Sequence, residues 1–502
     1  MRINKIFSPV HLKKIIIVSF LIHLLASVNS VGFHHLDEHY QVLEFAGLKL
    51  GHNTTAEVPW EYGARVRPAI QPAIAYFIIE SSNAAGISNP FGQAMIMRIL
   101  SAVLSIFCMF LLYKAFEDKI TIAGLIPWFI FLSFFLWFLT YMQVRFSSEG
   151  WSGSFFFIGF ALLFIENKSG KIFLKHFLIG LILGFSFLFR YQSGIMIFGL
   201  LLWLLLIKKE KLSNLFLLVT GITASIMIGI LIDKWFYGDW VLTAWNYLDF
   251  NILQGKASQF GVQPWYFYLK EIFREGIPPF SILLIGSFLF VFAVKPKSVF
   301  TWVLLPFLLV HFMIGHKELR FLFPIANIIP LIVVLSADEF NSDKFIRFKK
   351  YFENKYWRWL LNLFIVINTL YLINVCFRPA DYFVSLYQFV YNSYNKQKAV
   401  LLYPDEDPYL RAPEPANFYK SKNIERVKIE NNNDIEEAVQ KYPDEKILLL
   451  TDRFLLDDRY KRDDLSYRKV YQNLPKWVEM FNYNHWLERT KIFTIYEVNV
   501  EE

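Results

Sequence analysis

Long apolar runs recur along most of the chain and limit its fold more than any other feature. A helix that crosses a bilayer needs about 20 mainly apolar residues. The chain is 55% hydrophobic and only 19% charged over 502 residues, which is too apolar for a soluble protein of this size. We therefore predict a mainly α-helical, multi-pass membrane protein. About eleven spans are expected, at residues 14–31, 94–116, 120–141, 151–166, 174–189, 192–207, 213–232, 278–294, 298–315, 320–336 and 358–376.

The basic residues between these runs predict how the chain is oriented. Cytoplasmic loops of membrane proteins are enriched in lysine and arginine. With the N-terminus inside, every basic cluster falls on the cytoplasmic side, and this accounts for the net charge of +8 without nucleic acid as a partner. The clusters are residues 2–14, 114–119, 168–175, 208–211, 295–297 and 344–355. The loops 32–92 and 233–277 and the tail from 396 are then expected outside.

The tail differs in composition from the rest of the chain. A transmembrane domain over residues 1–376 is expected to be followed by a small outer α/β domain at 396–502. Strands are predicted at 399–403, 447–451 and 492–498, and a helix at 433–442. We find no glycine-rich phosphate loop there. Cys108 and Cys376 lie inside apolar runs, so neither a disulfide nor a zinc site is predicted.

An unusually polar stretch follows the first apolar run directly. Ionisable groups at such a depth are costly and tend to mark function. Apolar residues then recur at helical spacing up to Gly51, so Asp37 is expected near a helix N-terminus, where an ionised carboxylate is favoured. Such a carboxylate can act as a base; the alternative is a helix N-cap with solvated neighbours. The stretch reads His34, His35, Leu36, Asp37, Glu38, His39, Tyr40, Gln41.

Further polar clusters fall on the same predicted face of the membrane. Aromatic residues among them also suit simple anchoring at the interface. Arg145 and Glu149 have the spacing of an ordinary helical ion pair, and Lys317 and Arg320 could extend to lipid head groups. Together, however, a carboxylate base, cations and aromatic platforms suit sugar transfer from a lipid phosphate. The clusters are 60–68, 145–149, Arg190, 235–266 and 316–321.

Four motifs resemble those of glycosyltransferase family 22, the dolichyl-phosphate-mannose-dependent α-mannosyltransferases. The resemblance covers about residues 14–340. It rests on His35-Leu36-Asp37-Glu38, on Trp60-Glu61-Tyr62 followed by Arg67, on the run from Asp233 to Trp265, and on His316-Lys317-Glu318-x-Arg320-Phe321-x-x-Pro324. Pro68 and the pair Tyr191-Gln192 depart from the family pattern, which indicates an altered acceptor site.

The resemblance implies a GT-C fold and inverting transfer from a polyprenyl-phosphate sugar to a glycan or glycolipid acceptor, with no metal and no cofactor. Asp37 would correspond to the catalytic base, and Glu38 would orient the acceptor. The donor phosphate would be held by His316, Lys317, Arg320 and Arg190. The candidates for sugar or acceptor contacts are His35, Trp60, Glu61, Arg67, Arg145, Glu149, Tyr237, Asn251 and Trp265.

Two alternatives to a mannosyltransferase remain open. A multi-pass transporter would also carry charges, but near the midplane on broken helices. Another lipid-phosphate-sugar transferase or ligase of similar architecture would differ in the length of its donor glycan. The composition, rich in Lys, Asn, Phe and Ile, inclines towards a bacterial member in the cell membrane; a eukaryotic member would lie in the endoplasmic reticulum membrane.

Overall fold

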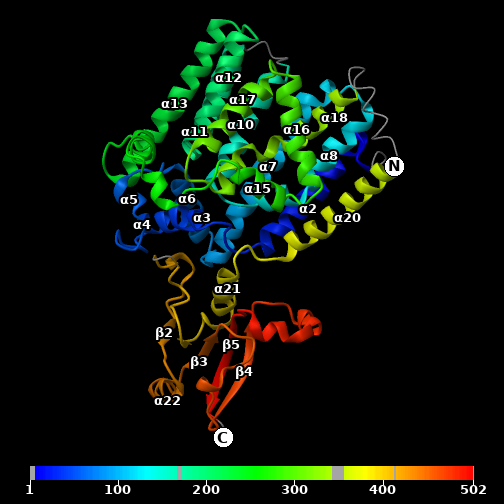
Figure 1. Cartoon of the computed structure of the whole chain (residues 1–502). Helices are drawn as coiled ribbons and strands as arrows, with labels where there is room; N and C mark the ends of the chain where they lie inside the picture. The colour runs from blue at the N-terminus through cyan, green and yellow to red at the C-terminus, as the bar shows by residue number, and fades with distance from the viewer. Residues whose placement is uncertain (1–5, 167–171, 342–354, 412–413, 501–502) are drawn as a thin grey trace. The chain divides into compact units, whose positions relative to one another are not determined.

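A computed structural model describes residues 6–166, 172–341, 355–411 and 414–500 (Figure 1). The basic segments at 167–171 and 342–354 lie outside the described residues. The chain divides into two compact units. The first unit, here called the helical unit, contains residues 1–30, 60–81 and 94–378. The second, here called the mixed unit, contains residues 31–59, 82–93 and 379–502.

Helices make up the helical unit, and each predicted apolar run is helical. Among the described residues, five helices are long and apolar enough to cross a membrane, or up to seven if each of two bent pairs is one span. The predicted count of about eleven spans is therefore not confirmed. The main helices are α2 (Leu12–Asn29), α7 (Pro90–Phe116), α8 (Ile126–Phe135), α9 (Trp137–Gln143), α10 (Ser148–Phe164), α11 (Ile172–Phe189), α12 (Ser193–Leu206), α13 (Leu212–Tyr237), α16 (Phe280–Val294), α17 (Val299–Met313), α18 (Ile329–Phe340) and α20 (Lys355–Phe377).

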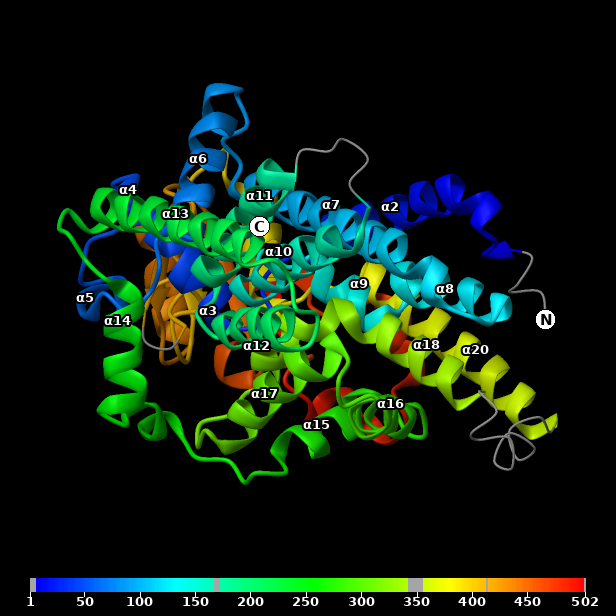
Figure 2. The ribbon, with the colours of Figure 1, turned by 90° about the horizontal axis from the view of Figure 1, so that it is seen from above.

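Glycines allow several of these helices to touch through their backbones. A Cβ on Gly180 of α11 would lie 2.2 Å from the Leu218 carbonyl oxygen of α13, and α11 and α13 run side by side (Figure 2). A Cβ on Gly153 of α10 would lie 2.3 Å from the Pro324 carbonyl oxygen in the 3₁₀ segment η7 (Leu319–Ile328). Small residues at helix interfaces permit this close approach in membranes.

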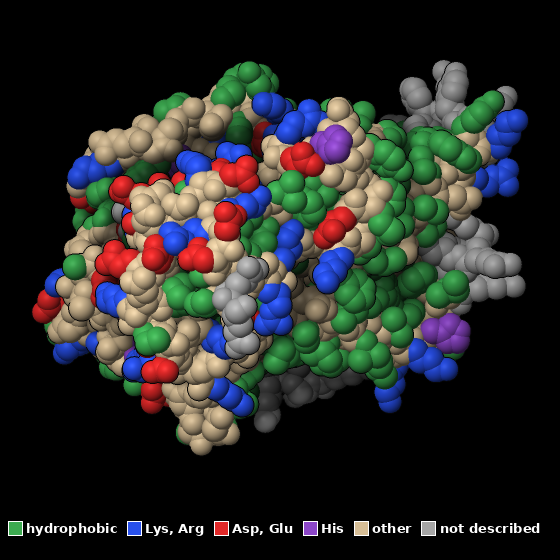
Figure 3. Space-filling view, turned by 90° about the horizontal axis from the view of Figure 1, so that it is seen from below, with side chains coloured by type: hydrophobic (Ala, Val, Ile, Leu, Met, Phe, Trp, Pro, Cys, Tyr) green, Lys and Arg blue, Asp and Glu red, His purple; other side chains and the backbone are tan. Residues whose placement is uncertain are grey.

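Large apolar side chains remain exposed on the outer surfaces of α2 and α20. Leu21 of α2 and Leu370 of α20 are 55% and 61% exposed. The two helices pack against each other, and Figure 3 shows hydrophobic side chains gathered over this face. Apolar patches of this kind suit contact with lipid.

The mixed unit contains a five-stranded sheet in the order β2-β1-β3-β5-β4. The predicted strands correspond to β1 (Ala399–Tyr403), β3 (Lys446–Thr451) and β5 (Thr494–Val500), and the predicted helix to α22 (Asn432–Lys441). The two edge strands, β2 (Ile424–Lys428) and β4 (Leu465–Gln472), were not predicted, nor was helix α21 (Tyr382–Tyr394). Strands β1, β2 and β3 are parallel, whereas β5 is antiparallel to β3 and β4.

The same unit includes the start of the first outer loop. Helix α3 (Leu36–His39) continues through a π-helical turn, η2 (Tyr40–Glu44), into α4 (Phe45–Lys49). Gly51, with φ of +71°, follows the helix as predicted. Tail residues are bonded directly to this loop: Glu44 accepts from the Phe418 N–H at 3.0 Å, and the Tyr40 hydroxyl donates to the Glu414 carbonyl at 3.0 Å.

Candidate active site

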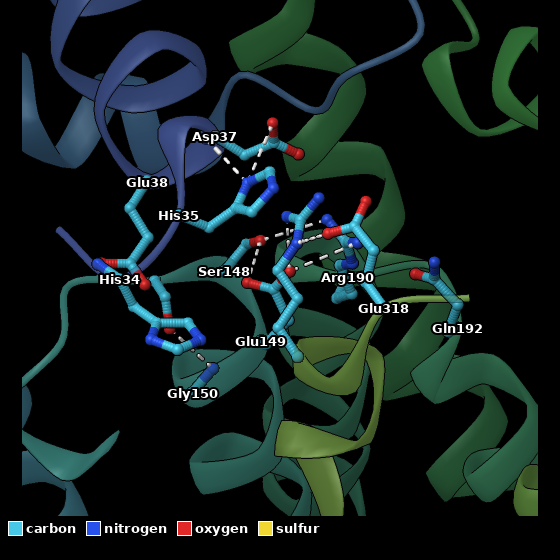
Figure 4. Close-up of polar contacts among 12 residues, drawn as sticks. His34, His35, Asp37, Glu38, Ser148, Glu149, Gly150, Arg190, Gln192 and Glu318 are labelled. Carbon is cyan, nitrogen blue, oxygen red and sulfur yellow. Dashed lines mark hydrogen bonds and ion pairs between the residues drawn. The ribbon is translucent and has the colours of Figure 1, made fainter. Parts of the chain in front are cut away.

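Asp37 lies in the first turn of α3, in the mixed unit. The N-cap is His35, whose Nδ1 accepts a 3.2 Å hydrogen bond from the Asp37 N–H. The Asp37 Oδ1 lies 3.4 Å from the same nitrogen, and Figure 4 marks this contact. The Asp37 side chain is 22% exposed. The alternative that Asp37 is itself the cap is thus wrong, because His35 serves that role. Glu38 accepts from the His34 N–H at 3.2 Å, which fixes the entry to the helix.

A buried contact between a histidine and a glutamate lies at the end of this helix. His39 Nε2 lies 2.7 Å from Glu44 Oε1, and both side chains are buried. The imidazole stacks between Phe33 and Tyr419, each with ring centroids 5.3 Å away. Glu44 also accepts from the Asn53 side chain at 2.7 Å. Several directional contacts therefore hold the helix that carries Asp37.

Charged residues gather separately within the helical unit. Glu149 stands in the first turn of α10, where Ser147 caps the helix by accepting from the Gly150 N–H. Glu149 Oε1 lies 3.3 Å from Arg190 and 3.1 Å from Arg320. Burial of all three side chains strengthens this pairing, since such charges need partners away from water. Figure 4 shows Glu149 and Arg190 directed toward each other.

The His316 to Arg320 motif extends this group. Glu318 accepts from Arg320 Nε at 2.5 Å and lies 2.9 Å from His316 Nε2. Lys317 Nζ donates to the carbonyls of Ile314 at 2.5 Å and of Gln263 at 3.0 Å. Lys317 is only 5% exposed, so it does not extend to head groups as in the alternative interpretation.

We call this group the cation cluster; it consists of Glu149, Arg190, His316, Lys317, Glu318 and Arg320. Burial lowers the pKa of Lys317 from its usual value, because desolvation disfavours the ammonium form. With Lys317 charged, three cations face two carboxylates, before any charge on His316 is counted. The cluster therefore has excess positive charge, which suits an anionic group such as a phosphate.

A second polar network ties the long outer loop to the rest of the helical unit. Asp233 of α13 accepts from the Ala69 N–H at 2.8 Å and from the Thr243 hydroxyl at 2.6 Å. Thr243 lies 2.6 Å from the Tyr191 hydroxyl, and Gln192 donates to the Tyr247 hydroxyl at 2.8 Å. Tyr191 and Gln192, the two residues that depart from the family pattern, thus hold helix α14 (Thr243–Leu248) beside Arg190. Sequence reasoning did not identify this role.

The structure brings some of the candidate sugar-contact residues together. Arg67 Nη2 lies 3.5 Å from Glu61 Oε1. The backbone carbonyl of Arg67 accepts a 2.8 Å hydrogen bond from the Tyr237 hydroxyl. Trp60 stacks on the Phe250 ring, with centroids 4.7 Å apart. These contacts join the segment 60–68 to the long outer loop and to the end of α13.

Three further candidates lie in different surroundings. Arg145 is 2% exposed and donates to the Ser30 carbonyl at 2.8 Å. Asn251 donates to the Tyr247 carbonyl one helical turn away. Trp265 is 66% exposed. Of these, Trp265 is the one with a large surface available for stacking.

A mainly helical architecture with several helices long and apolar enough to cross a membrane is that of a multi-pass membrane protein, and it carries a buried cluster of cationic and acidic side chains. The model of the Alg9-like mannosyltransferase family matches residues 15–398. The chain belongs to this family of glycosyltransferases.

Similar proteins are found in eukaryotes. The chain is 27% identical over 321 residues to GPI alpha-1,2-mannosyltransferase 3 of Bos taurus, covering 61% of this chain and 55% of that protein. It is 24% identical over 310 residues to mannosyltransferase APTG1 of Arabidopsis thaliana, covering 61% and 54%. A probable Dol-P-Man:Man(7)GlcNAc(2)-PP-Dol alpha-1,6-mannosyltransferase of Schizosaccharomyces pombe is 32% identical over 193 residues, covering 37% and 34%. The chain thus spans about half the length of the curated relatives it matches.

Proposed function

We propose that the protein transfers mannose from a polyprenyl-phosphate-mannose donor to a glycan or glycolipid acceptor, with inversion, at the outer or luminal membrane face. The cation cluster is the observation that carries this proposal. Its excess positive charge is buried and is held by elements far apart in sequence. Family membership supports mannose as the sugar. We further propose that the helical unit has a GT-C architecture; among the described residues five helices, or up to seven spans if each bent pair counts as one, are long and apolar enough to cross a membrane.

In this proposal the cation cluster binds the leaving lipid phosphate. Lys317 and Arg320 are the primary cations, Arg190 adds to the local charge, and His316 is a further proposed ligand. Negative charge grows on the phosphate as its bond to the sugar breaks, so a preorganised set of donors lowers the barrier. Glu149 and Glu318 orient the guanidinium groups and limit the charge that would otherwise be buried without partners.

Asp37 is the proposed base. It takes the proton of the acceptor hydroxyl while that oxygen bonds to C1 of mannose and the C1–phosphate bond breaks. The phosphate leaves with the bonding electron pair, and the glycosidic bond forms on the opposite face of the sugar. A helix dipole favours an acidic side chain in the first turn, and the His35 ring accepts a hydrogen bond from the Asp37 N–H. Glu38 orients the acceptor.

One experiment tests the proposed function as a whole. Purified protein is incubated with polyprenyl-phosphate-mannose and a panel of candidate acceptor glycolipids, and products are identified by mass spectrometry. The proposal predicts addition of one mannose to an acceptor. A preassembled lipid-linked glycan serves as the comparison donor, and its exclusive use would instead indicate a ligase. Absence of transfer from either donor across the acceptor panel would contradict the proposal.

A further inference from the structure

Two adjacent residues at the start of α12 carry buried polar atoms without a partner. Gln192 Oε1 and Ser193 Oγ are both enclosed, and neither has a hydrogen-bond partner among the residues that the structure describes. Ser193 is fully buried. Such atoms are rare in folded proteins, because leaving a buried polar group unpaired costs free energy, and each requires an explanation.

The other end of the Gln192 amide is fixed. Its Nε2 donates to the Tyr247 hydroxyl at 2.8 Å, and Tyr247 belongs to α14 of the long outer loop. Two residues earlier in the chain, Arg190 pairs with Glu149 in the cation cluster. Figure 4 draws Gln192 in the same close-up as Arg190 and Glu318. The unpaired amide oxygen is therefore held in a set position close to the proposed phosphate site.

The chemistry of these atoms restricts what they can bind. A glutamine Oε1 only accepts hydrogen bonds, whereas a serine hydroxyl both donates and accepts. A fully ionised phosphate ester offers acceptors alone, so it does not satisfy Gln192. A sugar hydroxyl can donate to Gln192 and, in the same ring, accept from Ser193.

We propose that Gln192 and Ser193 form a subsite for sugar hydroxyl groups beside the cation cluster. This inference rests on the proposed function and adds to it a determinant of sugar recognition. The sugar is the mannose of the donor or the terminal residue of the acceptor glycan. The Tyr247 hydroxyl holds the Gln192 amide in place, so it contributes to sugar binding indirectly.

Binding measurements with paired lipids separate this subsite from the phosphate site. We compare the Kd of polyprenyl-phosphate-mannose with that of polyprenyl phosphate for the purified full chain and for Gln192→Ala. The variant is expected to lose about tenfold in the preference for the mannosylated lipid, the size of one good hydrogen bond. Its affinity for polyprenyl phosphate should not change. Tyr247→Phe, which frees the amide without removing it, should lose less.

The matched control is Gln254→Ala. Gln254 is an exposed glutamine of the same loop that bonds Asp249, and its loss should leave both Kd values unchanged. If the ratio of Kd values is unchanged in Gln192→Ala but the KM for the acceptor rises about tenfold, the subsite serves the acceptor sugar. The proposal would be overturned if Gln192→Ala weakened the binding of both lipids equally, or if neither Kd value nor the KM for the acceptor changed. A wild-type protein that neither binds polyprenyl-phosphate-mannose nor transfers mannose from it would contradict the proposed function itself.

Discussion

The Glu149 carboxylate accepts a 3.1 Å hydrogen bond from Arg320, although 171 positions separate the two residues. Their elements, α10 and η7, meet at Gly153, one helical turn beyond Glu149. A methyl group there would lie 2.3 Å from the Pro324 carbonyl oxygen. The ion pair at the centre of the cation cluster therefore depends on a direct backbone contact.

Gly153→Ala should separate these two elements. The added methyl has no room, and such overpacking typically costs about 1–3 kcal/mol. Thermal unfolding in detergent should show a lower Tm, and mannosyl transfer should fall with it. The control is Gly286→Ala in α16, where an added Cβ meets nothing within 4 Å. Equal Tm values for the two variants would show that α10 and η7 tolerate separation.

Lys317→Met tests the phosphate assignment more cleanly than a change at Arg320. Replacing Arg320 would leave Glu149 and Glu318 short of a cation in a buried site, which destabilises the fold. Loss of Lys317 removes one charge-assisted contact, and kcat/KM for the donor should fall roughly a hundredfold. Lys270→Met, at an exposed position, should leave kcat/KM unchanged. A Lys317→Met variant with unaltered donor use would remove Lys317 from the phosphate site.

The first outer loop and the tail should lie on the same side of the membrane. Their residues are hydrogen-bonded within one compact unit, through Glu44 to Phe418 and Tyr40 to Glu414. Single cysteines at the exposed positions Thr55 and Asn433 should both react with an impermeant reagent added to right-side-out vesicles. Reaction of only one of the two sites would contradict this topology.

The turn at residues 54–57, shortly before Trp60, should become less stable at acidic pH. Hydrogen bonds from the backbone N–H and the hydroxyl of Thr54, both 2.8 Å, lower the pKa of Glu57 from about 4.5. A lowered pKa means that this carboxylate stabilises the fold above pH 4.5 and loses that contribution as pH falls through its folded value. Hydrogen exchange of residues 50–58 should therefore quicken in Glu57→Gln at pH 7. The difference from wild type should vanish below the folded pKa; a difference that persists there would show that Glu57 acts independently of charge.

Features set by local pattern could be predicted from sequence. Apolar runs long enough for membrane helices are helical because the backbone must satisfy its own hydrogen bonds in lipid. The buried strands β1 and β3 were evident from their unbroken apolar residues. The edge strands were not: Glu425 and Arg426 in β2, and Arg468 and Lys469 in β4, give these segments the charged pattern of exposed edges.

Features set by contacts distant in sequence could not be predicted. No periodicity links Glu44 to Phe418, yet that pairing joins the first loop to the tail. The cap at His35 was missed because histidine is an uncommon N-cap, and the signal favoured Asp37. The anchoring role of Tyr191 depends on Thr243, which lies 52 residues further along the chain.

Asp37 is the residue on which the proposed chemistry depends most. Asp37→Asn should fold normally, because the helix start is fixed by the Asp37 backbone and the His35 ring. Donor binding should also persist, since the proposed phosphate ligands lie elsewhere in the sequence. Removal of the proton acceptor should nevertheless reduce turnover by about 10²–10⁴-fold. Glu38→Gln, the neighbouring carboxylate, is the matched control and should lose much less.

Transfer of labelled mannose from polyprenyl-phosphate-mannose by folded, purified Asp37→Asn protein, with donor Kd measured in parallel, is the most direct test. We predict a turnover reduced by about 10²–10⁴-fold at an unchanged donor Kd. Turnover close to that of the wild type would contradict the assignment of Asp37 as the base.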